Sequence, residues 1–166
     1  MRDLIAPLAI AACATAFLAA PAFALTRTIT MQAHGSGVCQ GALPNFEGKL
    51  RKRPLGIQNE GTESAYVTCS PTNFQNAPNA FGFSVGVANY NATSITITCT
   101  GVHGQVSSAA ATFVTKSVTI ASNFNDFIDF PAAIFNNANA PSVSCLLPPG
   151  TSVDTVYSYQ TLDVGG

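Results

Sequence analysis

Apolar and polar residues alternate with a period of two along most of the chain beyond residue 25, the pattern of β-strands with one buried face. The clearest case is residues 81–88, where every odd position is bulky and apolar and every even position is small. The small face of this segment must lie exposed or against a close neighbour. Residues 94–100 place isoleucines and a cysteine on one face and hydroxyl residues on the other. Because a short, Asn-rich segment joins the two stretches, we expect them to pair as a hairpin.

Seven further segments show the same alternation, with turn-forming residues between them. They are residues 28–33, 55–58, 65–69, 112–121, 127–131, 142–147 and 155–162. No stretch beyond residue 25 has a convincing helical period, and no internal repeat is visible. Eight to nine short strands predict an all-β fold, a disulfide-bonded β-sandwich of the immunoglobulin-like or jelly-roll-like kind.

The first 24 residues have the pattern of an export signal. Arg2 precedes an apolar stretch, and Ala22-Phe23-Ala24 supplies the small-x-small pattern at which signal peptidases cut. We therefore expect residues 1–24 to be a cleaved signal peptide and residues 25–166 to be a single domain in the periplasm or outside the cell. Cys13 ends a lipobox-like tetrapeptide, so lipidation of Cys13 is the alternative to cleavage after Ala24. No later apolar run reaches the ~20 residues of a membrane-spanning helix.

Four cysteines remain after the signal: Cys39, Cys69, Cys99 and Cys145. In an oxidising compartment they are expected to form disulfides. Their spacing lacks the closely paired cysteines of a zinc site, so we expect no metal. Four cysteines allow three pairings, of which chain order favours Cys39–Cys69 with Cys99–Cys145. Each such bridge stabilises the fold by about 3.5–4 kcal/mol in the chain-entropy treatment.

Charged residues make up only 9% of the chain, against a usual share of about 25%. The near-neutral balance excludes nucleic acid as a partner and gives no general attraction to anionic membranes. One basic run stands out, formed by Lys49, Arg51, Lys52 and Arg53. On a loop, this run is a candidate anion-binding site for a surface polyanion such as lipopolysaccharide. The alternatives are a solvated loop that maintains solubility, or a strand edge protected from pairing.

The residues that carry catalysis are sparse. His34 and His103 are far apart in sequence, each follows or precedes glycine, and no Gly-x-Ser-x-Gly motif accompanies them. Asp126 and Asp129 are candidates for a carboxylate pair or a weak metal site, but they also fit a strand with solvent-facing acids. We therefore assign no catalytic residue and expect neither a cofactor nor enzymatic activity.

Several short motifs together carry a resemblance to a known group of proteins. The motifs are Cys39, Gly56-Ile57-Gln58-Asn59, Ala65-Tyr66-Val67-Thr68-Cys69-Ser70-Pro71, Val85-Gly86-Val87-Ala88-Asn89-Tyr90-Asn91, Ile95-Thr96-Ile97-Thr98-Cys99, Val143-Ser144-Cys145-Leu146-Leu147-Pro148-Pro149-Gly150 and Tyr157-Ser158-Tyr159. With these motifs the chain resembles a loose family of small, four-cysteine exported proteins of Gram-negative bacteria. The resemblance implies cysteine pairing in the order one–two and three–four, and it implies no functional residues.

The function that these observations favour is a non-enzymatic, exported structural or binding module. Its expected partner is a surface polyanion, a glycan or a second copy of the chain. The first alternative is an assembling, pilin-like subunit, because residues 28–33 alternate and can add as a strand to a neighbour. Against this alternative, the chain lacks the penultimate tyrosine typical of chaperone–usher pilins. A secreted hydrolase is the more distant alternative.

Overall fold

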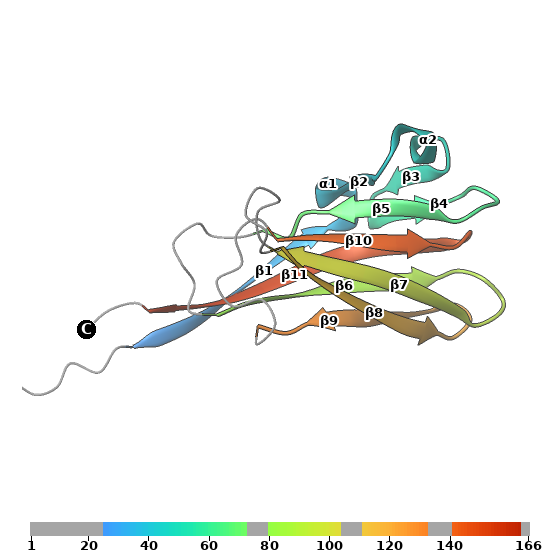
Figure 1. The fold of residues 1–166 in the computed structure, drawn as a ribbon. Coiled ribbons are helices and arrows are strands. Elements are labelled where there is room, and N and C mark those ends of the chain that lie inside the picture. Colours follow the sequence, from blue (N-terminus) through green and yellow to red (C-terminus); the bar gives the residue numbers. More distant parts are fainter. Residues whose placement is uncertain (1–24, 73–79, 104–110, 133–140, 164–166) are drawn as a thin grey trace, which may run out of the picture.

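The computed structural model describes residues 25–72, 80–103, 111–132 and 141–163, which form two β-sheets packed face to face (Figure 1). The expected signal peptide, residues 1–24, and with it Cys13, lies outside these residues. The elements are β1 (Thr26–His34), α1 (Gly35–Val38), β2 (Cys39–Gly41), α2 (Pro44–Glu47), β3 (Leu50–Arg53), β4 (Gly56–Asn59), β5 (Ala65–Cys69), β6 (Ala80–Asn89), β7 (Ile95–His103), β8 (Thr112–Ile120), β9 (Phe124–Phe130), β10 (Ser142–Leu147) and β11 (Thr151–Asp163).

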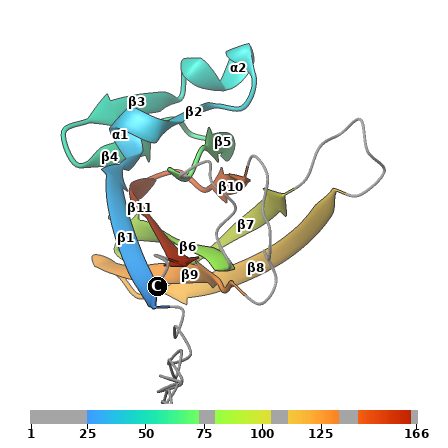
Figure 2. The same cartoon turned by 90° about the vertical axis from the view of Figure 1, so that its left-hand side faces the viewer.

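One sheet, here called sheet A, has the order β3-β4-β11-β6-β9. Strand β1 also belongs to it and pairs with β11 on the same edge as β4. The other sheet, sheet B, has the order β2-β5-β10-β7-β8, and neighbouring strands in both sheets run antiparallel. Figure 2 shows the two short helices on one side of the sandwich, next to β2 and β3.

The expected all-β sandwich is confirmed, but with eleven strands in the described residues rather than eight or nine. All nine predicted segments are strands. The two that were missed, β2 and β3, have three and four residues, too few for alternation to be detected. No helix in the described ranges is long and apolar enough to cross a membrane.

The core lies between the sheets and contains the bulky positions of the alternating segments. The rings of Phe83 and Phe130 stack at a centroid distance of 4.7 Å on neighbouring strands of sheet A. The largest fully buried apolar side chains are Phe81, Phe83, Phe130, Ile57, Ile97, Ile120 and Leu147. Period-two alternation therefore predicted the buried face correctly.

The expected hairpin between residues 81–88 and 94–100 is wrong. β6 belongs to sheet A and β7 to sheet B, so the connection crosses between the sheets as an arch. Asn89, which is fully buried, holds this arch: its Nδ2 donates to the carbonyl of Thr93 at 2.8 Å, and its Oδ1 accepts from the amide of Asn91 at 2.9 Å. These hydrogen bonds satisfy the arch backbone without a hairpin ladder.

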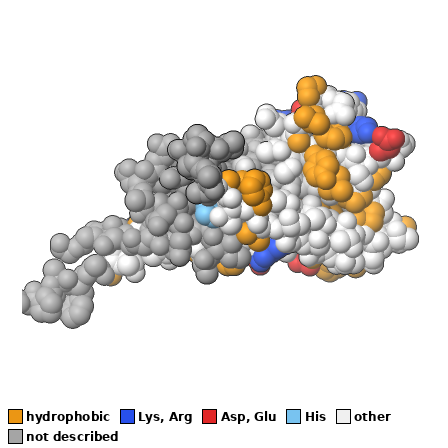
Figure 3. Space-filling model, viewed as in Figure 1, with side chains coloured by type: hydrophobic (Ala, Val, Ile, Leu, Met, Phe, Trp, Pro, Cys, Tyr) orange, Lys and Arg blue, Asp and Glu red, His pale blue; other side chains and the backbone are white. Residues whose placement is uncertain are grey.

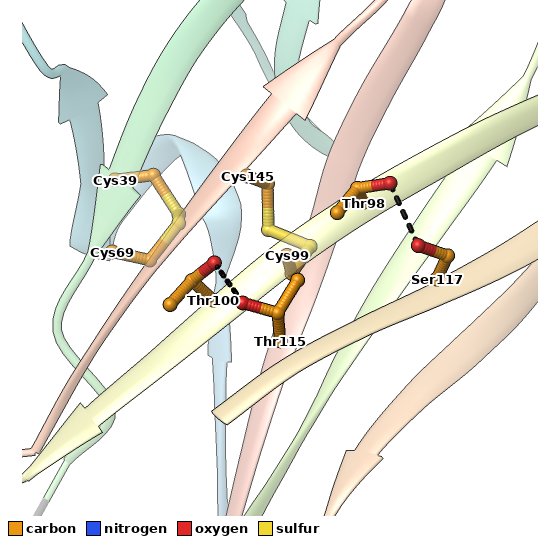
Figure 4. The surroundings of a disulfide bond; sticks show 8 residues. All are labelled: Cys39, Cys69, Thr98, Cys99, Thr100, Thr115, Ser117 and Cys145. Carbon is orange, nitrogen blue, oxygen red and sulfur yellow. Dashed lines mark hydrogen bonds between the residues drawn. A yellow bond between two sulfur atoms is a disulfide. The ribbon is translucent and has the colours of Figure 1, made fainter. Parts of the chain in front are cut away.

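Both disulfides join directly opposed residues on neighbouring strands of sheet B (Figure 4). Cys39 is bonded to Cys69 between β2 and β5, and Cys99 to Cys145 between β7 and β10, the chain-order pairing that the sequence favours. All four cysteines are buried on the inner face. The bridges therefore fix strand register within sheet B and do not link the two sheets.

Candidate functional site

Four chain connections cross between the sheets at one end of the sandwich, on the right in Figure 1. They are the arches β4–β5, β6–β7, β8–β9 and β10–β11. Hydrogen bonds join neighbouring arches: the amide of Tyr90 donates to the carbonyl of Gly150, and the amide of Gly150 donates to the carbonyl of Asn59, both at 2.9 Å. This end of the molecule is therefore a continuous surface built from segments far apart in sequence.

A shallow pocket of about 240 Å³ opens where these arches meet the outer face of sheet A. Two of its lining residues are exposed aromatics, Tyr90 at 49% and Phe124 at 67% of full exposure. The complete lining is Ala88, Asn89, Tyr90, Asn123, Phe124, Asn125 and Asp154. Exposed rings beside a carboxylate and amides are the kind of mixed lining that binds small polar ligands.

The local backbone directs the polar groups of the pocket. Asp154 lies in a β-bulge of β11, between Val153 and Thr155, where the register with β6 shifts; a bulge of this kind re-aims a side chain out of the regular alternation. The carboxylate of Asp154 accepts a short hydrogen bond from the Ser152 hydroxyl. Asn123 has a φ of 56°, a left-handed conformation that asparagine adopts more readily than most residues.

Next to the pocket, the outer face of sheet A carries three more aromatic residues. Phe127 and Tyr157 lie with ring centroids 5.6 Å apart, and Tyr159 reaches across β6. A Cβ at Gly82 would lie 2.3 Å from the Tyr159 ring, and a Cβ at Gly86 would lie 3.1 Å from the Phe127 ring. The small face of residues 81–88 is therefore covered by side chains from both neighbouring strands, Tyr159 and Thr155 from β11 and Phe127 from β9.

Hydrogen bonds and charge hold this outer face together. The Ser84 hydroxyl donates to the Asp129 carboxylate at 2.5 Å, and Gln32 donates to the Thr155 hydroxyl at 3.3 Å. Burial raises the pKa of the Tyr159 phenol, and the nearby Asp129 carboxylate raises it further. The protonated phenol is thus the form that the fold favours.

The basic run lies on an edge strand rather than on the expected loop. Arg51, Lys52 and Arg53 belong to β3 at the edge of sheet A, and Lys49 precedes it. Lys49 forms an ion pair with Glu63 at 2.5 Å, and Arg53 forms one with Glu60. The alternation of the strand directs Arg51 and Lys52 to opposite faces. Two of the four charges are thus paired within the chain, and anion binding by the run stays a prediction.

The remaining candidate residues are not brought together. His34 lies opposite Thr155 in sheet A and His103 lies opposite Thr112 in sheet B. Asp126 and Asp129, three positions apart in β9, face opposite sides of the strand, which does not suit a shared cation. Within the described residues, no three His, Cys, Asp or Glu side chains are grouped to hold a metal.

The segment that the pilin-like alternative would add to a neighbouring molecule is used within the chain. Residues 28–33 lie inside β1, and all nine residues of β1 pair with β11 in register from Thr26↔Asp163 to His34↔Thr155. One edge of this strand is therefore occupied by the protein itself.

The pocket was missed from the sequence. The sequence predicts a turn at Asn89 and Tyr90, and Asp154 lies far along the chain, so only the arches bring them together. An aromatic residue in an otherwise small and polar connection was the one available signal, because turns seldom need a large ring.

Comparisons with known proteins return distant structural similarities alone. No protein-family model matches the chain, and no curated protein matches it. Among solved structures it is similar to the xylan-binding module CBM15, with 8% identity, coverage of 81% of this chain and 97% of that one, and a TM-score of 0.38. It is also similar to a family 11 carbohydrate-binding module from Clostridium thermocellum, in complex with a β-1,3-1,4-mixed-linked tetrasaccharide, with 9% identity, coverage of 80% of this chain and 87% of that one, and a TM-score of 0.37. For a family 16 carbohydrate-binding module the identity is 10%, the coverage is 66% of this chain and 73% of that one, and the TM-score is 0.35. Values this low do not bear on what the present chain binds.

Proposed function

We propose that this protein is an exported, non-catalytic β-sandwich module that binds an uncharged glycan in the pocket at the arches. The observation that carries the proposal is the placing of Tyr90 and Phe124, both about half or more exposed, around the carboxylate of Asp154. Aromatic faces pack against the C–H groups of a sugar ring, while carboxylate and amide groups hydrogen-bond its hydroxyls. The disulfides fit a protein that folds in an oxidising compartment.

The charge of the pocket favours a neutral ligand over a polyanion. Asp154 is the one charged residue among those lining it, and its charge is negative. A sulfated or phosphorylated polymer would be repelled by this carboxylate. None of the basic residues of β3 is among the residues that line the pocket.

The same lining supports binding rather than hydrolysis. Glycoside hydrolysis ordinarily requires two carboxyl groups, one on each side of the scissile bond. The residues that line this pocket include a single carboxylate, that of Asp154. The Asp129 carboxylate is on the same outer face, but it accepts the Ser84 hydroxyl and is not part of the lining.

The test is a binding screen of the oxidised mature chain against soluble neutral oligosaccharides, repeated with Tyr90→Ala and Asp154→Ala. We expect each substitution to weaken binding at least tenfold, because each removes one of the two kinds of contact that the pocket offers. Leu43→Ala is the control, since Leu43 is 55% exposed, directly precedes α2 and lies outside the pocket lining. Equal affinity in Tyr90→Ala and the parent chain, or an equal loss in Leu43→Ala, would overturn the assignment of the site.

A further inference from the structure

The outer face of sheet B carries pairs of hydroxyl groups aligned along β7 and β8. Three directly opposed pairs bridge the strands: Thr96 with Thr119, Thr98 with Ser117, and Thr100 with Thr115. Their oxygen–oxygen distances are 2.8, 2.7 and 2.9 Å. We call these six residues the hydroxyl face. Each hydrogen bond uses one proton, so every pair retains one free O–H donor and several lone pairs.

Beyond the hydroxyl face, outward-facing hydroxyl residues continue across the sheet onto β10 and β5. Thr100 lies opposite Ser144, and Ser144 lies opposite Thr68 on its other side. One row of hydroxyl residues therefore crosses four strands. The next row contains Leu146 and Tyr66 beside Thr98, which adds apolar surface at one border.

This face is uncharged. The described residues that point outward on β5, β10, β7 and β8 include no Asp, Glu, Lys or Arg. Figure 3, viewed onto sheet B, shows uncharged polar side chains between two groups of hydrophobic ones, with the charged side chains at the margin. Tyr66 and Phe113, at 45% and 67% exposure, mark the two apolar borders. A ligand that matches this face has many hydroxyl groups, apolar C–H surface and no charge.

Covalent bonds hold the strands under the hydroxyl face in register. The Cys99–Cys145 disulfide joins β7 to β10 on the inner side, between the outward-facing Thr98 and Thr100 (Figure 4). The hydroxyl pairs join β7 to β8 on the outer side. A surface fixed in this way pays little ordering entropy when a rigid ligand docks on it.

We propose that the hydroxyl face, with its Tyr66 and Leu146 border, is a second binding surface that adsorbs to the uncharged face of an insoluble polysaccharide. The proposal extends the glycan binding proposed for the pocket, but it depends on different residues on the opposite sheet. Mutual hydrogen bonding of the pairs is by itself a known way to stabilise neighbouring strands. Three features together point to a ligand: the row of hydroxyl residues that crosses four strands, the lack of charged residues on this face, and its exposed apolar borders.

The pocket at the arches and the hydroxyl face, on opposite sheets, give the molecule two separate contacts with the same polysaccharide. The pocket at the arches accepts a single chain or chain end, whereas the hydroxyl face spans several strands and suits several parallel chains. Simultaneous engagement raises apparent affinity for a particle above that for a soluble oligosaccharide, because the second contact is made at high effective concentration.

The experiment measures adsorption of the oxidised mature chain to particles of microcrystalline cellulose, of chitin and of insoluble β-1,3-glucan. The variant combines Thr98→Val, Ser117→Ala, Thr100→Val and Thr115→Val, which removes both partners of two pairs, so that neither pair is left with a single hydroxyl. Valine keeps the shape of threonine and its strand preference. Thr96→Val with Thr119→Val is the second, smaller variant, to be used if the first unfolds at a lower temperature. Soluble-oligosaccharide binding, measured in parallel, reports on the pocket.

We expect the parent chain to adsorb to at least one particle type, and each hydroxyl-face variant to lose at least fivefold in adsorption. Soluble-oligosaccharide binding should remain unchanged in these variants. Adsorption should also be unchanged by raising salt well past the ionic strength of about 0.15 M, since the face has no charge to screen. Parent-like adsorption of the folded variants, or an absence of adsorption by the parent chain, would overturn the proposal. If adsorption depends on the hydroxyl face while Tyr90→Ala changes neither adsorption nor soluble-oligosaccharide binding, the pocket is refuted and the hydroxyl face stands.

Discussion

Asn59 and Asn89, thirty positions apart, make the same set of hydrogen bonds in the two arches that flank the β10–β11 arch. The Oδ1 atom of each accepts from the amide two residues on, at 3.0 Å from Gly61 and 2.9 Å from Asn91. The Nδ2 atom of each donates to the carbonyl four residues on, Glu63 at 2.9 Å and Thr93 at 2.8 Å. Each Nδ2 also donates to a carbonyl in sheet B, that of Leu147 in β10 for Asn59 and that of Ile120 in β8 for Asn89. Both asparagines are fully buried.

The match extends beyond the two asparagines. Residues 56–69 and 86–99 each run from a buried strand of sheet A, through an arch, to a cysteine in a strand of sheet B. Five of the fourteen aligned positions are identical: glycine, asparagine, serine, threonine and cysteine. The chain thus contains an internal repeat that the sequence did not reveal, because the shared positions are dispersed and the arch residues between them differ.

The first prediction concerns stability at the arches. Asn89→Ala and Asn59→Ala should each lower the free energy of unfolding by about 1–3 kcal/mol, because each leaves buried carbonyl groups without a donor. Asn125→Ala, at an exposed position in β9, is the control and should stay within about 0.5 kcal/mol of the parent. Urea denaturation of the oxidised proteins gives the comparison. Similar losses in all three variants would show that the buried amides do not hold the arches.

The second prediction concerns the glycine beneath Tyr159. Gly82→Ala places a methyl group 2.3 Å from the Tyr159 ring, so the ring must move, at a cost of about 1–3 kcal/mol. The same change in a Tyr159→Ala background should cost much less, since the obstructing ring is gone. Gly37, where a Cβ meets nothing within 4 Å, provides the surface control as Gly37→Ala. A double-mutant cycle measures the coupling, and an additive result would refute the contact.

The third prediction follows from the raised pKa of the Tyr159 phenol. In the unfolded chain a tyrosine ionises near pH 10, whereas in the fold Tyr159 keeps its proton to a higher pH. Its contribution to stability is therefore complete below about pH 10 and is lost as the pH rises through the folded-state pKa. The ultraviolet absorbance of tyrosinate should therefore include a late step, above the ordinary ionisation range of tyrosine. Tyr159→Phe should remove that late step, and its persistence would assign the step to another tyrosine.

The fourth prediction tests the basic run. Within the described residues Arg51 and Lys52 form no ion pair, while Lys49 and Arg53 do. If the run attracts polyanions, Arg51→Gln with Lys52→Gln should reduce retention on heparin more than Lys49→Gln with Arg53→Gln. The parent chain should elute from heparin before the salt concentration reaches about 0.15 M, because at that concentration the screening length has fallen to about 8 Å. Equal retention of both double variants and the parent chain would leave β3 as a strand edge protected by charge.

Alternation along the sequence predicted the strands well, because burial on one face imposes a period of two. Residues 65–69 and 142–147 have the same bounds in the structure as in the prediction. Alternation says nothing about which strands are neighbours, so β6 and β7 were paired when the chain in fact crosses between sheets. The crossing between sheets depends on the buried Asn89, whose hydrogen bonds to the carbonyls of Ile120 at the end of β8 and of Ala121 after it form only in the complete fold.

The candidate site was beyond the reach of the sequence for a similar reason. Tyr90, Phe124 and Asp154 come from three different connections or strands, and only the stacking of the arches brings them to one pocket. The bulge that frees Asp154 from the alternation of β11 cannot be seen without its partner strand. The cysteine pairing followed chain order, in contrast, because each pair lies on strands that neighbour one another in sheet B.

The most direct test of the central claim is to map a bound glycan onto the backbone amides of the oxidised mature chain by nuclear magnetic resonance. The probe is the soluble neutral oligosaccharide that gives the strongest response in the binding screen. The account predicts that the shifted amides cluster at residues 88–90, 123–125 and 154, and that Tyr90→Ala abolishes the shifts. Shifts confined to β3, or to the strands of sheet B, with the pocket amides unmoved, would contradict it.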